Sequence, residues 1–326
     1  MKAVAADSFD SFANYRIVDV PEISPGPAEV RIRVASVGIG YVDALIARGR
    51  YQVKPDTPHI PGAEVAGTID AVGPGVKGWQ LGDRVLAMTR AGLAEQALAS
   101  AASCRLIPTG ISSAQAAAFP LNHLTALHAL ANRGRLMPEE TLLVFGGAGG
   151  VGTAAIAVGK QLGATVIAAA STPEKRAFAI AHGADNAIDT DPDRWRDRLR
   201  ELLGGSQLDV VLDPVMGPLF QPAFRSLGWG GRHLVVGFVG GPIPALPGNL
   251  PLMKGAALIG VDVRQFQLIE QQATSNHLDT LVAWLSDGRL PAPTTLEYSW
   301  SQAPAALAQA FGGQTLGKVV LRHPHE

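Results

Sequence analysis

The stretch from Thr141 to Gly152 reads Thr-Leu-Leu-Val-Phe-Gly-Gly-Ala-Gly-Gly-Val-Gly, an apolar run followed at once by a glycine-rich turn. Residues 141–145 have the composition of a buried strand. An amphipathic helical pattern over residues 150–162 comes next, and a second apolar run over residues 165–170 follows it. Strand, glycine-rich turn, helix and strand in this order predict a parallel β-α-β unit.

The glycines of this turn satisfy the pattern Gly-x-Gly-x-x-Gly through Gly147, Gly149 and Gly152. Between a strand and a helix, that pattern is the signature of a dinucleotide-binding loop. We expect Gly147 to permit the tight turn, Gly149 to let the backbone approach a pyrophosphate, and Gly152 to let the helix pack on the strand. The free amides and partial positive charge at the helix N-terminus favour phosphates. We therefore predict a Rossmann domain that binds its cofactor through Gly147, Ala148, Gly149, Gly150, Val151 and Gly152.

The end of the second strand indicates which dinucleotide is bound. NAD-specific domains carry an acid there, about 20 residues beyond the loop, which accepts hydrogen bonds from the ribose 2′-hydroxyl. This chain has Ser171 instead, with Lys175 and Arg176 nearby, a set that suits a 2′-phosphate. In the other interpretation the two cations are ordinary exposed helix residues and Glu174 binds the ribose. Because Glu174 follows a proline in the first helical turn, where an acid serves the helix dipole, NADPH is the favoured cofactor.

The first hundred residues are β-rich. Residues 30–34 alternate apolar and charged side chains, as a strand with one buried face does. Similar runs over residues 65–72 and 84–88 are separated by glycine-containing turns, and one helix is expected over residues 42–48. This part of the chain is predicted to form a β-rich domain.

From about residue 113 the pattern changes to alternating helices and strands. Beyond the glycine-rich unit, the expected elements are a helix over residues 173–181, strands over 209–212 and 233–238, a helix over 278–285 and a final strand over 318–321. Strands that alternate with helices predict a doubly wound parallel sheet, so the fold class is α/β. The predicted α/β domain, residues 121–264, lies between the two parts of the β-rich domain, residues 1–120 and 265–326.

Composition argues against several classes of function. Lys and Arg number 27 against 28 Asp and Glu, so no overall field favours nucleic acid or an anionic membrane. No run of apolar residues is long enough to span a membrane, and the N-terminus lacks the apolar core of a signal peptide. Cys104 is the only cysteine, which excludes an intramolecular disulfide and fits a reducing compartment. We expect a cytoplasmic protein with no nucleic-acid or membrane partner.

Several segments resemble the medium-chain dehydrogenase/reductase superfamily. Pro-Gly-Ala-Glu-Val-Ala-Gly at residues 61–67 and Gly-Asp-Arg-Val at residues 82–85 resemble its general signature. Further segments resemble the zinc-free quinone oxidoreductase branch of this superfamily: Leu212 to Val215, Gly230 to Arg232, Val235 to Phe238, Leu246 to Gly255 and Gly317 to Leu321. The resemblance covers the whole chain and implies a GroES-like β-rich catalytic domain, a Rossmann domain, NADPH in a cleft, and a homodimer joined through the Rossmann sheets.

Zinc-dependent members of the superfamily carry Cys at the position of Gly40 and His at the position of Ala63. Catalytic zinc needs three protein ligands, typically Cys and His. With both positions replaced and one cysteine in the chain, we predict that no zinc is bound. Asp43 and Glu64 match positions that orient or surround zinc in those relatives, and are expected here to cap a helix and stabilise a turn.

Four side chains are candidates for handling the charge that develops on a substrate oxygen: Tyr41, Tyr51, Asn122 and His123. Tyr51 matches a tyrosine that many quinone oxidoreductases place near the nicotinamide, although a half-buried aromatic at a turn is an equal alternative. Many members carry Asn where Gly40 stands, and Asn122 and His123 could partly replace that polar group. A helix cap or a packed side chain is the alternative role of His123.

Three further residues match family positions near the cofactor. Phe238 is expected to end the last parallel strand, where members contact the nicotinamide through main-chain atoms. Asn249 and Lys318 match motif positions close to the cofactor.

The favoured function is an NADPH:quinone reductase that passes hydride to a small hydrophobic quinone without flavin or metal. Reduction of the C=C bond of an enone or alkenal is an open alternative, because both acceptors are conjugated carbonyls. A second alternative is an NADPH-binding sensor or structural protein with little turnover. Gly40 leaves this alternative open, because it lacks the side-chain amide that many members carry at this position.

Overall fold

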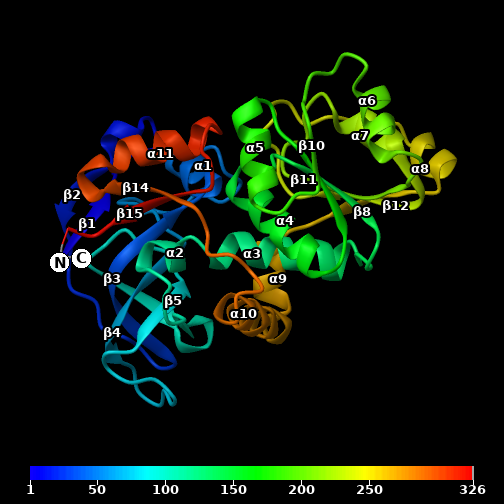
Figure 1. Cartoon of the computed structure of the whole chain (residues 1–326). Helices are drawn as coiled ribbons and strands as arrows, with labels where there is room; N and C mark the ends of the chain where they lie inside the picture. Colours follow the sequence, from blue (N-terminus) through cyan, green and yellow to red (C-terminus); the bar gives the residue numbers. More distant parts are fainter. Residues whose placement is uncertain (325–326) are drawn as a thin grey trace. The chain divides into compact units, whose positions relative to one another are not determined.

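The computed structural model describes residues 1–324, and the chain divides into two compact units (Figure 1). Unit 1 contains Met1–Leu121, Leu278–Gly288 and Ala292–Glu326. Unit 2 contains Asn122–His277 and Arg289–Pro291. Helix α10 (Gln271–Ser286) begins in unit 2 and ends in unit 1, so the chain passes from one unit to the other within a helix.

Unit 1 is built on a seven-stranded sheet with the order β14-β15-β3-β4-β5-β7 and with β6 paired to β3. Its strands are β3 (Glu29–Ile39), β4 (Glu64–Val72), β5 (Arg84–Met88), β6 (Gln96–Ser100), β7 (Arg105–Leu106), β14 (Thr295–Ser299) and β15 (Lys318–Arg322). The C-terminal strand β15 runs antiparallel to β3, so segments from both ends of the sequence share one sheet. A separate antiparallel pair is formed by β1 (Lys2–Ala5) and β2 (Arg16–Asp19).

The core of unit 1 follows the alternation seen in the sequence. Val30, Ile32 and Val34 of β3 are buried, whereas Arg33 between them is exposed. Each buried aliphatic side chain of this kind contributes about 1.5–3 kcal/mol. The helices of unit 1 are η1 (Phe12–Asn14), α1 (Tyr41–Ala47), η2 (Ala101–Ser103), α2 (Ser113–Ala117), η4 (Trp300–Gln302) and α11 (Ala303–Gly312).

Unit 2 is built on a six-stranded sheet with the order β10-β9-β8-β11-β12-β13, in which every pair is parallel. The strands are β8 (Thr141–Phe145), β9 (Thr165–Ala169), β10 (Asn186–Ile188), β11 (Leu208–Asp213), β12 (Leu227–Val235) and β13 (Ala257–Gly260). From β8 the chain builds outward first through β9 and β10, and then on the other side through β11. The strand order therefore reverses beside β8, and such a switch point is where open α/β sheets bind ligands.

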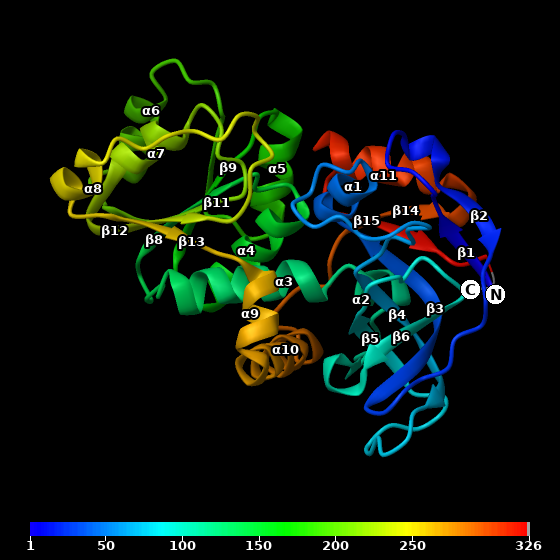
Figure 2. The ribbon, with the colours of Figure 1, turned by 180° about the vertical axis from the view of Figure 1, so that it is seen from behind.

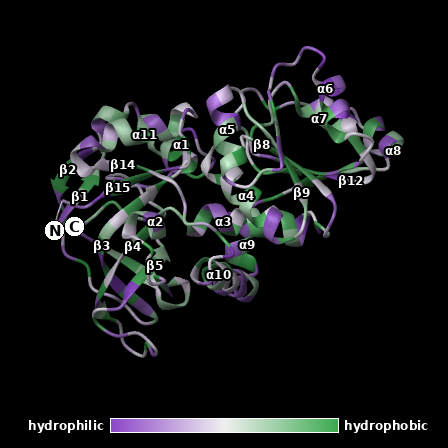
Figure 3. Ribbon diagram, viewed as in Figure 1, coloured by the Kyte–Doolittle hydropathy of each residue, from purple (hydrophilic) through white to green (hydrophobic). Residues whose placement is uncertain are grey.

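The helices of unit 2 are α3 (Pro120–Leu127), the π-helix η3 (His128–Arg133), α4 (Gly150–Gln161), α5 (Pro173–Ala181), α6 (Trp195–Leu203), α7 (Phe220–Ser226), α8 (Asn249–Lys254) and α9 (Val263–Ile269). Helices α4 to α8 connect the parallel strands, whereas α3 and η3 precede β8 and α9 follows β13 (Figure 2). All five residues of β8 are buried, as a strand covered on both faces requires. Figure 3 shows the apolar character of the neighbouring strand β9. The predicted α/β class, with a GroES-like part and a Rossmann sheet, is confirmed.

Two predictions about the sheet of unit 2 are wrong. Strand β12 ends at Val235, so Phe238 lies beyond the strand instead of ending it. The chain leaves the sheet there because the amides of Val239 and Gly240 donate to Pro214 O (3.3 Å) and Val215 O (2.8 Å) in the loop after β11. Strand β13 then follows, so β12 is not the last parallel strand.

None of the helices within residues 1–324 combines the length and the apolar character that a membrane span requires.

Candidate cofactor and active site

The glycine-rich loop links β8 to α4 at the switch point. The left-handed backbone conformation that a glycine accommodates falls at Gly146 (φ +64°), directly before Gly147 in the same turn. Gly147 is small for another reason, because a Cβ there would lie 2.8 Å from the Cβ of Ala168 on β9. A Cβ at Gly152 would overlap the carbonyl oxygen of Gly146, which fits its predicted packing role. At Gly149 the nearest atom would be 3.5 Å away, so its surroundings are the most open of the three motif glycines.

The first turn of α4 presents unused hydrogen-bond donors. The helix begins after Gly149, and its first helical bond runs from Thr153 N to Gly149 O (2.9 Å). Within the described residues, the amides of Gly150, Val151 and Gly152 have no protein acceptor. Free amides at the positive end of a helix dipole form an anion site. The loop therefore has the geometry that a dinucleotide pyrophosphate requires.

The end of β9 holds the residues predicted to choose the dinucleotide. Ser171 is exposed directly after the strand, and Thr172 caps α5 by accepting a hydrogen bond from Lys175 N (3.3 Å). The guanidinium of Arg176 donates to the carbonyls of Ala170 (3.1 Å) and Ser171 (3.4 Å), so it supports the strand end. Lys175 lies in the first turn of α5, beside this strand end.

Glu174, the alternative ribose partner, is engaged with the start of α5. Its pKa lies below the usual value, first because its own backbone amide donates to the carboxylate and then because the Thr172 hydroxyl does so. An acid stabilised in this way serves the helix N-terminus. This contact supports the interpretation in which Ser171 and Lys175 face the ribose.

A buried pair that the sequence did not single out lies at the carboxyl end of β11. Asp213 Oδ1 accepts hydrogen bonds from the amides of Val215 and Met216, both at 2.8 Å, and so shapes the loop that follows the strand. Its Oδ2 lies 3.1 Å from Nε2 of His233 on β12. The His233 side chain is fully buried between Phe220 and Phe224. The Leu-Asp-Pro-Val motif was a signal for this loop, but the pairing with His233 was not visible.

Two other predicted cofactor residues lie on exposed segments of unit 2. Phe238 is 44% exposed in the loop after β12. Asn249 is exposed at the start of α8, where its Nδ2 lies 3.5 Å from the sulfur of Met253. Their cofactor contacts stay predictions.

Asn122 and His123 lie within the first turn of α3, not before the helix as expected. Both are buried, with exposed fractions of 8% and 5%. The side chain of Asn122 lies against Gly150 at the start of α4, where a glycine Cβ would overlap its Nδ2. The structure thus brings one predicted catalytic residue to the predicted cofactor loop.

A buried group of charges lies in unit 1 around Glu64 and Lys318. Lys318 Nζ lies 2.5 Å from Glu64 Oε1, and Glu64 Oε2 accepts a hydrogen bond from Leu121 N (2.8 Å). Asp43 Oδ2 accepts from Gly40 N (2.8 Å) and its Oδ1 accepts from Gly62 N (3.2 Å). Asp43 therefore caps α1 and holds the turn at Gly62, as predicted.

Gly40 has no side chain, and Lys318 lies beside the space that a side chain at this position would occupy. A Cβ at Gly40 would lie 3.3 Å from Lys318 Nζ and 3.5 Å from Asp43 Oδ2. Burial raises the pKa of the Asp43 carboxyl above its ordinary value, and the Lys318 ammonium opposes that shift. The Asp43, Glu64 and Lys318 side chains are nearly inaccessible to water, so the ammonium balances carboxylate charge inside the protein. Within residues 1–324, no cluster of three His, Cys, Asp or Glu side chains could hold a metal ion.

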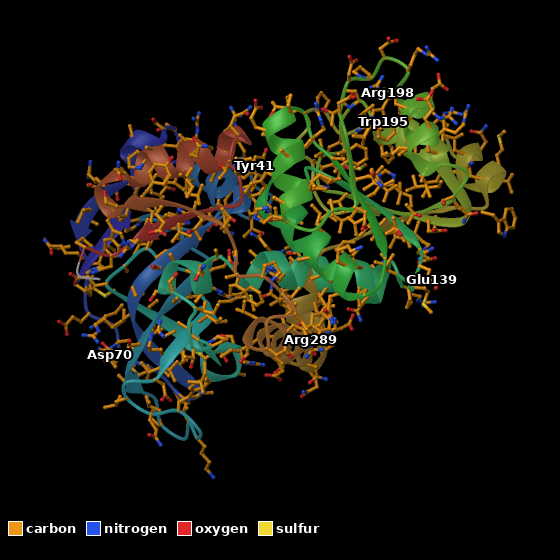
Figure 4. All side chains as sticks on the ribbon, viewed as in Figure 1. Tyr41, Asp70, Glu139, Trp195, Arg198 and Arg289 are labelled. Carbon is orange, nitrogen blue, oxygen red and sulfur yellow. The ribbon has the colours of Figure 1, made fainter. Side chains whose placement is uncertain are left out.

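Tyr41 and Tyr51 have different environments in unit 1. Tyr41 begins α1 (Figure 4), and its ring stacks on Phe311 with centroids 5.8 Å apart. Tyr51 lies in the bend after α1 and is half-buried. Cys104 is fully buried, and burial raises the pKa of its thiol to about 12, which makes it a poor nucleophile.

Comparisons with known proteins agree with this geometry. Residues 26–129 match the alcohol dehydrogenase GroES-like domain, and residues 150–282 match the zinc-binding dehydrogenase family. Quinone oxidoreductase-like protein 2 of Rattus norvegicus is 33% identical over 307 residues, covering 93% of this chain and 88% of the relative. The chain belongs to the zinc-free quinone oxidoreductase branch of the medium-chain dehydrogenase/reductase superfamily.

Solved structures of this superfamily have the same fold over the whole chain. A mycobacterial protein complexed with NADPH is 29% identical, with a TM-score of 0.89 and coverage of 99% of both chains. The CurK enoyl reductase is 25% identical, with a TM-score of 0.90 and coverage of 99% of both chains. Members of this superfamily are oxidoreductases, which supports an oxidoreductase, while the predicted quinone reductase activity stays a prediction.

Proposed function

We propose that the protein is an NADPH:quinone oxidoreductase that transfers hydride directly to a small hydrophobic quinone. The observation that carries the proposal is the open glycine-rich loop at the switch point, followed by Ser171 and Lys175 at the end of the next strand. The NADPH complex of the mycobacterial relative supports the choice of cofactor. Unit 2 would be the cofactor domain and unit 1 the catalytic domain.

The residues of unit 2 fit a nicotinamide dinucleotide. The amides of Gly150, Val151 and Gly152 would bind the pyrophosphate, and Ser171 and Lys175 would bind the 2′-phosphate. When bound, NADPH supplies the hydride, so the protein has to orient the acceptor and stabilise the charge on its oxygen. We propose that the main chain near Phe238 holds the nicotinamide and that Asn249 supports cofactor binding. Lys318, the remaining predicted cofactor residue, belongs to unit 1 and pairs with Glu64.

The acceptor end of the reaction is assigned to unit 1. The phenol of Tyr51 can donate a hydrogen bond to a quinone oxygen, because no described residue accepts one from it. Tyr41, whose ring is held by Phe311, would form part of the wall that orients a flat acceptor. His123, near the start of α3, is a further candidate, and it belongs to unit 2.

Reduction of the C=C bond of an enone is the second candidate, and the similarity to the CurK enoyl reductase favours it. Both reactions deliver hydride to a conjugated carbonyl and differ in the atom that receives it. Purified protein should be given NADPH with 1,4-benzoquinone or with a 2-alkenal, and the products identified. Formation of hydroquinone supports the quinone proposal, whereas turnover of the alkenal alone would replace it with the enone proposal.

We also propose that the protein is a homodimer joined through the sheets of unit 2. Strand β13 is the edge of the sheet, and Leu258 on it is 41% exposed. Trp229, 79% exposed, lies on the neighbouring strand β12. An exposed edge strand with apolar side chains is suited to pair with a second copy.

Light scattering should therefore give twice the chain mass of 34.0 kDa for the wild type. Leu258→Asp should shift the protein to the monomer, because it places a charge in the paired edge. Leu81→Asp, at a residue 68% exposed on a turn of unit 1, serves as the control and should stay dimeric. A monomeric wild type would contradict the proposal.

A further inference from the structure

Asn122 carries a buried side-chain amide that no protein group satisfies. The residue is 8% exposed, and no described residue forms a hydrogen bond with its Nδ2 or Oδ1. Neither of its polar atoms belongs to the side-chain atoms that are sealed from solvent without a partner, so the amide faces a space that a small molecule can reach. The missing partner is therefore expected to come from a ligand.

The position of this amide indicates where that ligand lies. Nδ2 lies against the α-carbon of Gly150, the first residue of α4. The amides of Gly150, Val151 and Gly152 at the same helix end also have no protein acceptor within residues 1–324. All of these groups are donors, and donors that gather at the positive end of a helix select an anion.

Neither the dinucleotide-binding pattern nor the backbone conformation requires a glycine at position 150. The dinucleotide pattern requires glycine at positions 147, 149 and 152, and leaves position 150 free. The backbone of Gly150 is not left-handed, so its conformation is open to any residue. A Cβ there would overlap Asn122 Nδ2 and lie 3.2 Å from its Cγ. The missing Cβ of Gly150 thus leaves the room that the side-chain amide of Asn122 occupies.

We propose that Asn122 is a cofactor-binding residue whose Nδ2 donates to the pyrophosphate of NADPH, and that Gly150 provides the room for it. The inference rests on the proposed function and deepens it. It also moves Asn122 from the substrate candidates to the cofactor site, alongside the amides of the first turn of α4.

The test compares two ligands that share the 2′-phosphate but differ in the pyrophosphate. Asn122→Ala should raise the dissociation constant of NADPH about tenfold to a hundredfold, the range expected for one hydrogen bond to a charged group. The affinity for 2′-AMP, measured by competition with NADPH, should not change, since 2′-AMP has no pyrophosphate. Asn122→Asp should weaken NADPH binding further, because a carboxylate would face the phosphates.

Asn132→Ala is the matched control. Asn132 follows in η3, and its Oδ1 accepts a hydrogen bond from Nε2 of His277 (2.6 Å). This variant should bind NADPH as the wild type does. An Asn122→Ala variant that loses NADPH and 2′-AMP affinity equally would show a structural role and overturn the proposal.

A double-mutant cycle tests the role of Gly150 separately. Gly150→Ala should weaken NADPH binding at least tenfold in the wild type, but cause little further loss when Asn122 is already alanine. Equal losses in both backgrounds would overturn the link between the two residues. A wild type that fails to bind NADPH would contradict the proposed function itself, whereas a wild type that binds while Asn122→Ala binds equally well would contradict only this inference.

Discussion

Lys318→Met is expected to lower the free energy of unfolding by about 3–5 kcal/mol, the usual effect of removing one partner of a buried ion pair. The side chain of Glu64 is fully buried and that of Lys318 is 5% exposed. Without the ammonium, Glu64 would keep the hydrogen bond from Leu121 N but lose its ion-pair partner, and Asp43 would lose a nearby positive charge. Chemical denaturation followed by fluorescence measures the change.

An exposed ion pair provides the control for this prediction. Lys2 pairs with Asp19 at 2.7 Å, with side chains 52% and 78% exposed, so Lys2→Met should leave the free energy of unfolding nearly unchanged. Adding Glu64→Gln to Lys318→Met should restore part of the lost stability, because it removes the uncompensated carboxylate. If the Lys318→Met protein were as stable as the Lys2→Met protein, the Lys318–Glu64 ion pair would not contribute the expected free energy of unfolding.

Lys175→Ala is expected to raise the dissociation constant of NADPH at least tenfold while hardly affecting NADH. The two cofactors differ only in the 2′-phosphate, and a hydrogen bond from a cation to that group contributes about 1.5–3 kcal/mol. Arg176 cannot fully compensate, because its guanidinium donates to the carbonyls of Ala170 and Ser171. Titration of each cofactor against intrinsic fluorescence gives both constants.

Lys160→Ala is the matched control for Lys175. Lys160 lies in the last turn of α4 and pairs with Asp185 at 2.8 Å, so its replacement should leave both cofactors bound as in the wild type. Equal weakening of NADPH and NADH by Lys175→Ala would contradict the assignment of the 2′-phosphate site. In that case Glu174 would be the better candidate for the residue that binds the ribose.

Local patterns predicted the elements around the cofactor loop closely. The predicted strand at residues 141–145 and helix at residues 173–181 agree with β8 and α5, because apolar runs, glycine turns and a helix-capping Thr-Pro pair are read within a few residues. The start of β12 was missed because glycines dilute its apolar pattern, and its end was placed too late because the apolar run continues past Val235 to Phe238. The polar first turns of α10 hid the start of that helix in the same way.

Contacts between distant segments could not be predicted from these patterns. Glu64 and Lys318 are 254 residues apart, and only the pairing of β15 with β3 and of β3 with β4 brings them together. The Asp213–His233 pair likewise depends on the parallel register of β11 and β12. The assignment of Asn122 to the substrate was an interpretation by family position, whereas its contact with Gly150 is a property of the folded chain.

Quinone-dependent oxidation of NADPH by the purified protein, with NADH as the parallel cofactor, tests the central claim most directly. Loss of NADPH absorbance on addition of 1,4-benzoquinone or 9,10-phenanthrenequinone, with a much slower loss of NADH, is the predicted result. It would support both the reductase proposal and the role of Ser171 and Lys175. Tight NADPH binding without turnover of any quinone or alkenal would contradict the account and favour a cofactor-binding protein that acts without catalysis.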